Sequence, residues 1–160
     1  MLLFDSKVNS QHGDWKIVND AVMGGKSTSQ VTTEHSRLLL FEGHVSLENN
    51  GGFAMCQYHF NKKTIEGYSK FILNIKGDGK TYQFRVKRDS NDRHSYIYPF
   101  KTNGSSQTVE IPFSDMQPAF HGKKLVIDNF SSTKMEMIAF LIGNKKAEDF
   151  QLEIKSIQLQ

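Results

Sequence analysis

Apolar residues recur at every second position along most of the chain, in short runs that are bounded by Gly, Asn, Asp or Ser. In segments 80–88 and 107–113, apolar and polar residues alternate, which places the two kinds of side chain on opposite faces of a β-strand. Segments 135–143 and 150–159 are almost continuously apolar, which predicts central strands that are buried on both faces. The pattern therefore indicates strands throughout the chain.

Turn-forming residues separate these runs at regular intervals. The clearest turns are at residues 49–52, 77–79 and 102–106, where Asn, Asp, Thr, Ser and Gly cluster. Helical signals are weak, and residues 64–70 and 113–120 predict no more than single turns. Several short strands at this spacing predict an all-β fold, either a β-sandwich or a barrel.

Composition narrows the class of protein further. A chain of 160 residues is long enough for a single domain with a substantial core over residues 1–160. Its 20 Lys and Arg residues oppose 17 acidic residues, for a net charge of +3, and their scatter along the chain disfavours a nucleic-acid partner. The single cysteine, Cys56, excludes an internal disulfide and a cysteine-rich zinc site. No secretory signal and no membrane-spanning run is evident, so we expect a soluble, cytoplasmic protein.

The segment WKIVNDAVMGGKS, residues 15–27, allows two interpretations. Glycines permit positive φ angles or a close backbone approach, and short polar side chains can bond to the amides of a turn. In the structural interpretation, the segment is a rigid, self-capping connection between strands. In the functional interpretation, it presents a carboxylate, backbone amides and a flat glycine surface to a partner. The candidate residues are Trp15, Asn19, Asp20, Met23, Gly24, Gly25 and Ser27, and a second loop repeats this chemistry with Asn50, Gly51 and Gly52.

Patterns typical of catalysis and metal binding are missing from the sequence. The six histidines include no pair at the i, i+4 spacing of a helical metal site. No Gly-x-Ser-x-Gly elbow occurs, and Cys56 lies in an alternating run, where we expect it to fill the core. We therefore expect a protein that is not an enzyme and that carries no cofactor.

Aromatic residues in segment 96–100 suggest a second kind of site. Tyr96 and Tyr98 share one face of a predicted strand and could stack on sugar rings at a concave sheet surface. Gln57 and Arg85 could bond to sugar hydroxyls beside them. The alternative is that these aromatic residues belong to the core, as aromatic residues in sheets usually do.

Four segments of the chain resemble the complex I intermediate-associated protein family in order and in spacing. They are DWKIVNDAVMGGKSTSQV, FEGHVSLENNGGFA, IKGDGKTYQFRV and VEIPFSDMQPAFHGKKL, and the resemblance covers residues 4–157. It implies a galactose-binding-like β-sandwich, which is a jelly roll. The best-known members are mitochondrial, non-catalytic assembly factors for NADH:ubiquinone oxidoreductase. The resemblance therefore implies a protein partner, such as an assembly intermediate of a respiratory complex.

The chain departs from the family pattern in two respects. Gln57 follows Gly-Gly-Phe at a distance where the family often has a basic residue, which puts in doubt an anion contact from that strand. No mitochondrial presequence is evident, so the chain resembles a short bacterial relative. Sandwiches of this class often hold a structural calcium ion at a loop end, and Asp5, Asp20 and Glu153 are candidate ligands, although the leading expectation is no metal.

The leading hypothesis is a non-enzymatic binding module that acts as an assembly or chaperone-like factor. The loops that contain Asp20, Gly24, Gly25, Asn50 and Gly52 would contact the protein partner. The alternative hypothesis is a carbohydrate-binding jelly-roll module that uses the aromatic and polar residues of the concave sheet.

Overall fold

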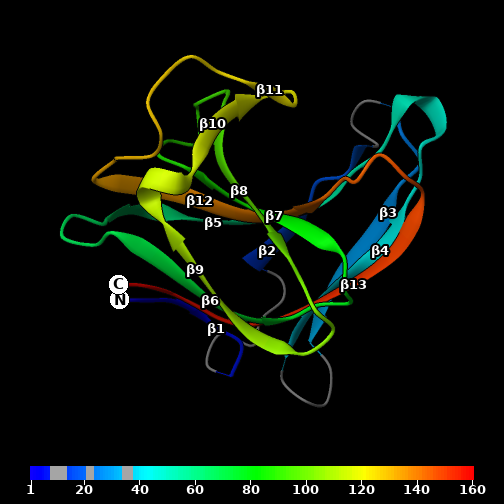
Figure 1. Cartoon of the computed structure of the whole chain (residues 1–160), viewed down its shortest axis with the longest axis horizontal. Helices are drawn as coiled ribbons and strands as arrows, with labels where there is room; N and C mark the ends of the chain where they lie inside the picture. The colour runs from blue at the N-terminus through cyan, green and yellow to red at the C-terminus, as the bar shows by residue number, and fades with distance from the viewer. Residues whose placement is uncertain (8–13, 21–23, 34–37) are drawn as a thin grey trace.

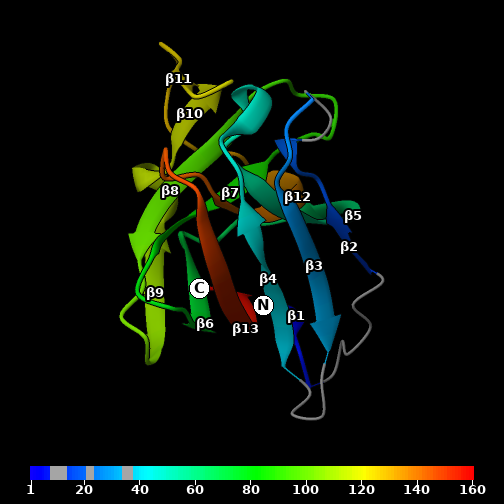
Figure 2. The same cartoon turned by 90° about the vertical axis from the view of Figure 1, so that its right-hand side faces the viewer.

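The computed structural model describes residues 1–7, 14–20, 24–33 and 38–160, which form two antiparallel β-sheets packed face to face (Figures 1 and 2). The first sheet has the strand order β3 (Thr28–Thr33), β4 (Leu39–Val45), β13 (Glu148–Leu159), β6 (Lys70–Lys76) and β9 (Ser106–Pro112), and β1 (Leu2–Asp5) also pairs with β13. The second sheet has the strand order β11 (Lys123–Lys124), β10 (Gln117–Phe120), β8 (Ser95–Lys101), β7 (Thr81–Lys87), β12 (Lys134–Ile142), β5 (Ala54–Thr64) and β2 (Trp15–Ile17).

The expected all-β fold is confirmed. Apart from the strands, the described residues contain short 3₁₀ turns, including η3 (Glu48–Asn50) and η4 (Phe113–Asp115). None of their helical segments has the length and apolar character needed to cross a bilayer. The two chain ends lie together, since the amino group of Met1 donates to the carbonyl oxygen of Leu159 at 2.9 Å (Figure 1).

The core lies between the two sheets and follows the predicted alternation. On β7, Tyr82 and Phe84 are fully buried, and the intervening residues face outward. Aromatic rings join the sheets, because Phe84 of the second sheet contacts Phe71 of the first, with ring centroids 5.0 Å apart. Phe84 also contacts Phe140 of β12 at 5.4 Å. Such edge and tilted contacts add to the stabilisation that comes from burying the rings.

The two strands predicted to be buried on both faces differ from each other. Strand β12 is central, and Met137, Ala139 and Leu141 are buried although they face away from the core. Strand β13 is also central, but its exposed residues Asp149 and Gln151 alternate with buried ones, so the prediction of burial on both faces is wrong there. On the outer face of β12, the long side chains of Gln57 and Arg85 flank Ala139 from the two paired strands, whereas the outer residues Asp149 and Gln151 of β13 are exposed.

Candidate functional site

The carboxylate of Asp20 is the centre of the junction between two loops. Asp20 follows β2 and is only 1% exposed. Its Oδ1 accepts a hydrogen bond from the amide of Ser27 at 3.0 Å, and its Oδ2 accepts one from the Ser27 hydroxyl at 2.5 Å. From the second loop, the amides of Gly52 and Phe53 donate to Oδ2 at 2.7 and 3.3 Å. The Asp20 side chain therefore ties residues 24–27 to residues 51–53.

The glycines of both loops leave room for this carboxylate. A Cβ atom on Gly25 would lie 2.3 Å from Cγ of Asp20, and one on Gly51 would lie 2.6 Å from its Oδ2. These distances are far below a van der Waals contact, so no other residue fits at either position without displacing Asp20. Gly24 is different, because its φ of 88° favours glycine although no atom of the described residues lies within 4 Å of its Cβ position.

Asn19 lies beside this junction, and Trp15 anchors the start of β2 in the core. Oδ1 of Asn19 accepts hydrogen bonds from the Ser29 hydroxyl at 2.8 Å and from the amide of Met55 at 3.3 Å. Trp15 is 5% exposed and stacks on Tyr58 with ring centroids 5.2 Å apart. The local geometry thus has the features of the structural interpretation of segment 15–27. Met23, also a candidate from the sequence, lies outside the described residues.

A groove of about 810 Å³, here called the sheet groove, crosses the outer face of the second sheet. Its floor consists of Met55 and Gln57 of β5, Leu141 of β12, and Gln83, Arg85 and Lys87 of β7. Strand register aligns these residues in rows, because Ala139 of β12 pairs with both Gln57 and Arg85. Ala139 is small, and the longer side chains on either side lie over it.

Two loops form the rim of the sheet groove. One contains Asn50, Gly51 and Gly52, so the second candidate loop lines the groove through the positions that the Asp20 junction fixes. The other is the turn after β10, with Phe120, the last residue of β10, beside it. The apolar side chains of Leu47 and Phe120 are 45% and 36% exposed on these two sides. Exposed apolar groups beside an open groove are typical of binding surfaces.

The basic side chains on the groove floor are partly withdrawn from solvent. Burial lowers the pKa of Arg85 to about 10. Burial also lowers the pKa of Lys87; the charge of Asp92 opposes this decrease, and that of Arg85 adds to it. Arg85 remains charged at neutral pH, and an anion placed beside the two side chains would raise both pKa values again.

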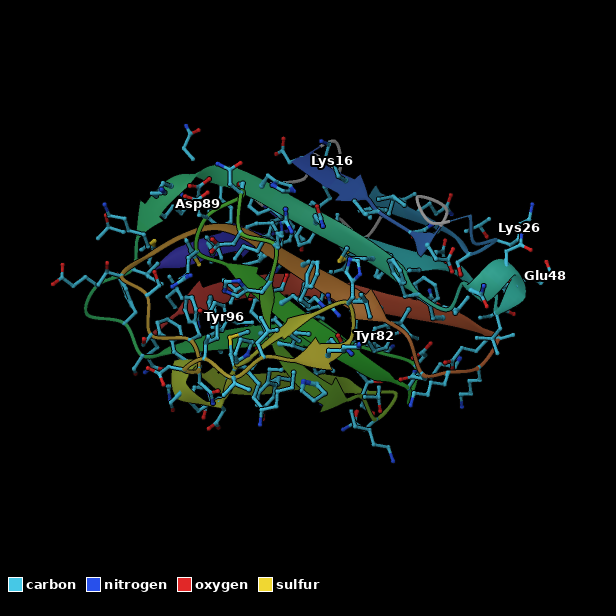
Figure 3. The ribbon with its side chains drawn as sticks, turned by 90° about the horizontal axis from the view of Figure 1, so that it is seen from above. Lys16, Lys26, Glu48, Tyr82, Asp89 and Tyr96 are labelled. Atoms are coloured by element: carbon cyan, nitrogen blue, oxygen red, sulfur yellow. The ribbon has the colours of Figure 1, made fainter. Side chains whose placement is uncertain are left out.

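The structure separates the residues of the predicted sugar site. Gln57 and Arg85 lie in the sheet groove, but Tyr96 is 3% exposed within the core cluster and Tyr98 packs against that cluster. Figure 3 shows Tyr82 and Tyr96 inside the molecule, whereas Lys16 and Lys26 lie at its periphery. The expected aromatic platform on the groove side is therefore wrong, because these tyrosines face the opposite side of the sheet from Arg85.

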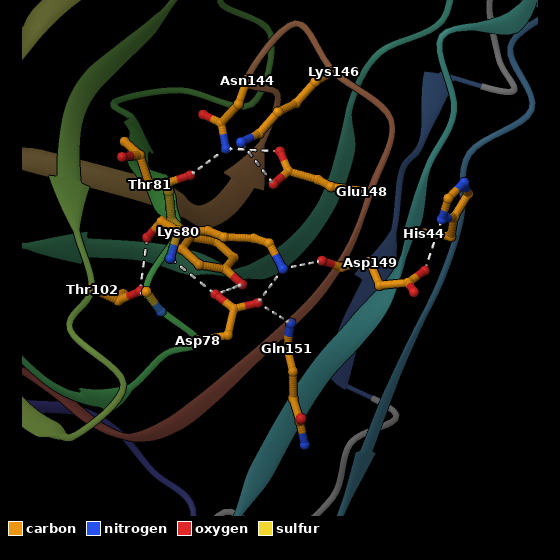
Figure 4. Close-up of polar contacts among 12 residues, drawn as sticks. His44, Asp78, Lys80, Thr81, Thr102, Asn144, Lys146, Glu148, Asp149 and Gln151 are labelled. Atoms are coloured by element: carbon orange, nitrogen blue, oxygen red, sulfur yellow. Dashed lines mark hydrogen bonds and ion pairs between the residues drawn. The ribbon is translucent and has the colours of Figure 1, made fainter.

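The Gly-Asp-Gly turn at residues 77–79 is a second junction (Figure 4). Oδ1 of Asp78 accepts a hydrogen bond from the Tyr82 hydroxyl at 3.0 Å, and Oδ2 accepts one from the amide of Gln151 at 2.8 Å. These residues connect β6 of the first sheet to β7 of the second, so the interpretation of the Asp-Gly pair as a tight hairpin turn is wrong: the connection joins the two sheets and not two paired strands. The turn also borders a second hollow of about 620 Å³, in which Asp78, Lys80 and Asp149 mix both signs of charge.

Metal-ligating side chains are not gathered in the described part of the chain. No group of three or more His, Cys, Asp or Glu residues there could hold an ion. The candidate calcium ligands are dispersed, because Asp5 ends β1, Glu153 lies within β13 and the Asp20 oxygens are bonded to the loops. The calcium site considered from the sequence is therefore not assembled.

Cys56 is a core residue, as expected. It is 0% exposed, and burial raises the pKa of its thiol far above the ordinary value of 9.0. We predict that Cys56 in the folded protein reacts with a disulfide reagent at least about a hundredfold more slowly than in urea, because the thiolate is the reactive form. The absorbance of the released thiol measures the rate. Equal rates with and without urea would contradict this packing.

Sequence reasoning identified one wall of the groove and two residues of its floor. It missed the contributions of Leu47, Phe120 and Lys145. These residues lie in segments distant in sequence from β7, and no local pattern relates them to it.

Comparison with known proteins agrees with this architecture. The model of the family called complex I intermediate-associated protein 30 (CIA30) matches residues 3–154. An uncharacterized protein of Schizosaccharomyces pombe is 26% identical over 181 residues, which cover 99% of this chain and 83% of that protein.

Solved structures resemble the chain in fold. The family 11 carbohydrate-binding module of the cellulase Lic26A-Cel5E from Clostridium thermocellum superposes with a TM-score of 0.76 at 16% identity, covering 99% of this chain and 92% of that chain. A family 29 carbohydrate-binding module has a TM-score of 0.56 at 7% identity, covering 99% and 89%. The implied galactose-binding-like jelly roll is confirmed. Because the family model spans nearly the whole sequence, the chain belongs to the complex I intermediate-associated protein 30 family.

Proposed function

We propose that the chain is a non-catalytic binding domain that takes part in complex I assembly by holding a protein partner in the sheet groove. Membership of the family supports the assembly role. The observation that carries the site is the open groove of about 810 Å³ with exposed Leu47 and Phe120 on its rim. The proposal includes a single domain over residues 1–160 and the cytoplasmic location expected from the sequence.

The loops predicted to contact the partner contribute to this site unequally. Asn50, Gly51 and Gly52 line the groove, and Asp20 and Gly25 lie behind them in the junction. We therefore assign direct contact to the second loop and a supporting role to the first. An assembly factor must bind its partner and later release it, and a preformed binding surface lowers the cost of ordering on binding. The sheet groove is such a surface, because buried hydrogen bonds fix its wall.

Carbohydrate binding is the second candidate. One solved relative in fold is a family 11 carbohydrate-binding module in complex with a β-1,3-1,4-mixed-linked tetrasaccharide. In this chain, Gln57 and Gln83 on the groove floor could bond to sugar hydroxyls, and Phe120 could stack on one ring. The core position of Tyr96 removes the larger aromatic surface that such a ligand would use.

A groove variant tests the proposal. We expect Leu47→Asp/Phe120→Asp to reduce capture of NADH:ubiquinone oxidoreductase subunits from a host detergent extract by about tenfold or more, because buried charge disrupts an apolar contact. Leu2→Asp is the matched control, since Leu2 is 53% exposed on the first sheet. Quantitative mass spectrometry of cross-linked captures gives the ratio.

Two results would contradict the assembly role. One is the absence of respiratory subunits from the wild-type capture, and the other is equal recovery with the groove variant. If the mixed-linked tetrasaccharide then raises the melting temperature of the wild type and leaves that of the groove variant unchanged, the second candidate replaces the first.

A further inference from the structure

The sheet groove is positively charged and has no carboxylate in its lining. Arg85, Lys87, Arg93 and Lys145 line it together with neutral and apolar residues. Among the described residues, none of these four side chains forms an ion pair with a carboxylate. The overall charge of +3 does not explain this arrangement, because acidic residues are nearly as numerous as basic ones.

Some basic residues outside the groove are paired with carboxylates. Lys62 of β5 pairs with Glu136 at 3.1 Å and with Asp89 at 3.5 Å. The carboxylate of Asp92 pairs with Arg88 at 3.3 Å, and Lys87 donates to the main-chain oxygen of Asp92 at 2.8 Å. The groove therefore gathers four basic side chains that have no ion pair in the described part of the chain and no carboxylate among the lining residues.

The guanidinium group of Arg85 is held in place on the groove floor. Its Nε and Nη2 atoms donate to Oε1 of Gln83 at 3.0 and 2.8 Å. In the described part of the chain, Nη1 has no hydrogen-bond partner. A guanidinium that is fixed on one edge and unbound on the other is preorganised for a carboxylate, because the rotamer is already selected.

Apolar side chains lie among these cations. Leu47, Phe53 and Phe120 stand on the walls, and Met55 and Leu141 lie on the floor. A neutral sugar would leave the cations without a counter-charge, and a small inorganic anion would leave the apolar groups exposed. A peptide that alternates acidic and apolar side chains satisfies both sets of groups, because its alternate side chains point in opposite directions.

We infer that the sheet groove binds an extended, acidic and apolar peptide segment of the partner protein, with Arg85 and Lys145 as its principal carboxylate contacts. This inference rests on the proposed function and specifies the chemistry of the partner. Lys87 and Arg93 contribute long-range attraction, which increases the rate of association at low salt.

A defined peptide tests the inference with purified protein. The probe is fluorescein-labelled Glu-Leu-Glu-Phe-Glu-Leu-Glu, and the comparison peptide has Gln in place of each Glu. Fluorescence anisotropy should show that Arg85→Gln/Lys145→Gln weakens binding of the acidic peptide by about tenfold or more. Raising the salt concentration should weaken wild-type binding, since the interaction depends on charge.

Matched controls separate local recognition from general charge. Lys76→Gln/Lys155→Gln removes the same charge from strands β6 and β13 of the other sheet and should leave affinity unchanged. Lys145→Gln alone covers the case in which the double variant fails to fold, because Lys145 is exposed. Amide chemical-shift changes on adding the acidic peptide should be confined to β5, β7, β12 and the groove loops.

Several outcomes would overturn the inference. Equal affinity for the acidic and neutral peptides would do so, as would equal weakening by the two double variants. Binding of oligogalacturonate but not of the peptide, with the same dependence on Arg85 and Lys145, would assign the groove to an acidic glycan. If the acidic peptide does not bind but Leu47→Asp/Phe120→Asp still abolishes capture of respiratory subunits, the proposed function stands and only the acidic chemistry is wrong.

Discussion

Replacing Asp20 with alanine is expected to lower the free energy of unfolding by about 3–5 kcal/mol, since hydrogen bonds to a charged group contribute roughly 1.5–3 kcal/mol each. The substitution leaves the buried amides of Ser27 and Gly52 without their acceptor. Urea unfolding followed by Trp15 fluorescence measures the change. Asp149→Ala is the control, because the Asp149 side chain is 90% exposed, and exposed ion pairs contribute no more than about 1 kcal/mol. A similar small loss for both variants would contradict the role of Asp20.

The same contribution should depend on pH. Burial opposes ionisation of Asp20, but the combined hydrogen bonds from Ser27, Gly52 and Phe53 outweigh burial and hold its pKa below the ordinary value of 3.8. As pH falls, the unfolded chain therefore binds a proton at this residue before the folded chain does. The stabilisation is fully present above the unfolded pKa and is lost as pH falls through the folded pKa. Urea unfolding of wild type and Asp20→Asn should give a stability difference that is constant near neutral pH and shrinks below 3.8.

The strands were predictable because burial on one face leaves a period of two in the sequence. On β7, the buried set Tyr82, Phe84 and Val86 contains only large apolar residues, so both the strand and its inner face could be inferred. On β8, the parity of Tyr96 and Tyr98 was also evident, but the opposite set includes Ile97 and Pro99. Because both sets are partly apolar, local pattern cannot decide which one faces the core. Pairing decides it, since Tyr98 lies opposite buried Phe84.

The candidate site was less predictable than the fold, for a topological reason. The order β8, β7, β12 and β5 brings together strands from three separate regions of the chain. Arg85 therefore meets Gln57 only across Ala139, and Lys145 joins them from the turn after β12. Sequence patterns report the face on which a residue lies. They do not report which strands are neighbours, so a groove built across neighbours is visible only in the structure.

The glycine-rich segments hold loops in position, including the Gly52 loop that forms one wall of the sheet groove. The Asp20 junction fixes Gly52 through its amide, and the Asp78 turn is fixed to β13 through the amide of Gln151. In both cases a buried or half-buried carboxylate binds main-chain amides of another segment. A carboxylate reaches main-chain amides in this way only if its side chain is short and the facing loop contains glycine. This requirement explains the composition of these segments, and it does not require each residue to contact a ligand.

Gly25→Ala is expected to destabilise the protein by about 2–4 kcal/mol, because its Cβ atom would lie within the van der Waals radius of the Asp20 carboxylate. Gly24→Ala is the matched control on the adjacent residue. There the described residues leave space for the methyl group, and the positive φ of 88° is expected to cost about 1–2 kcal/mol. Urea unfolding of the two variants separates steric displacement of Asp20 from backbone strain. Equal losses would contradict the close approach of Gly25 to Asp20.

A double-mutant cycle identifies the atoms responsible for the Gly25 effect. In the Asp20→Ala background, Cγ and Oδ1 are gone and only Cβ remains, 2.7 Å from the added methyl group. Gly25→Ala should therefore destabilise this background by at least about 1 kcal/mol less than the wild type, which is within the usual coupling of residues in contact. Additive losses would mean that Gly25 is constrained by something other than Asp20. Strong coupling would instead show that Asp20 and Gly25 act as one structural unit. A loss of partner affinity in either variant would then follow from displacement of Gly52 at the groove wall.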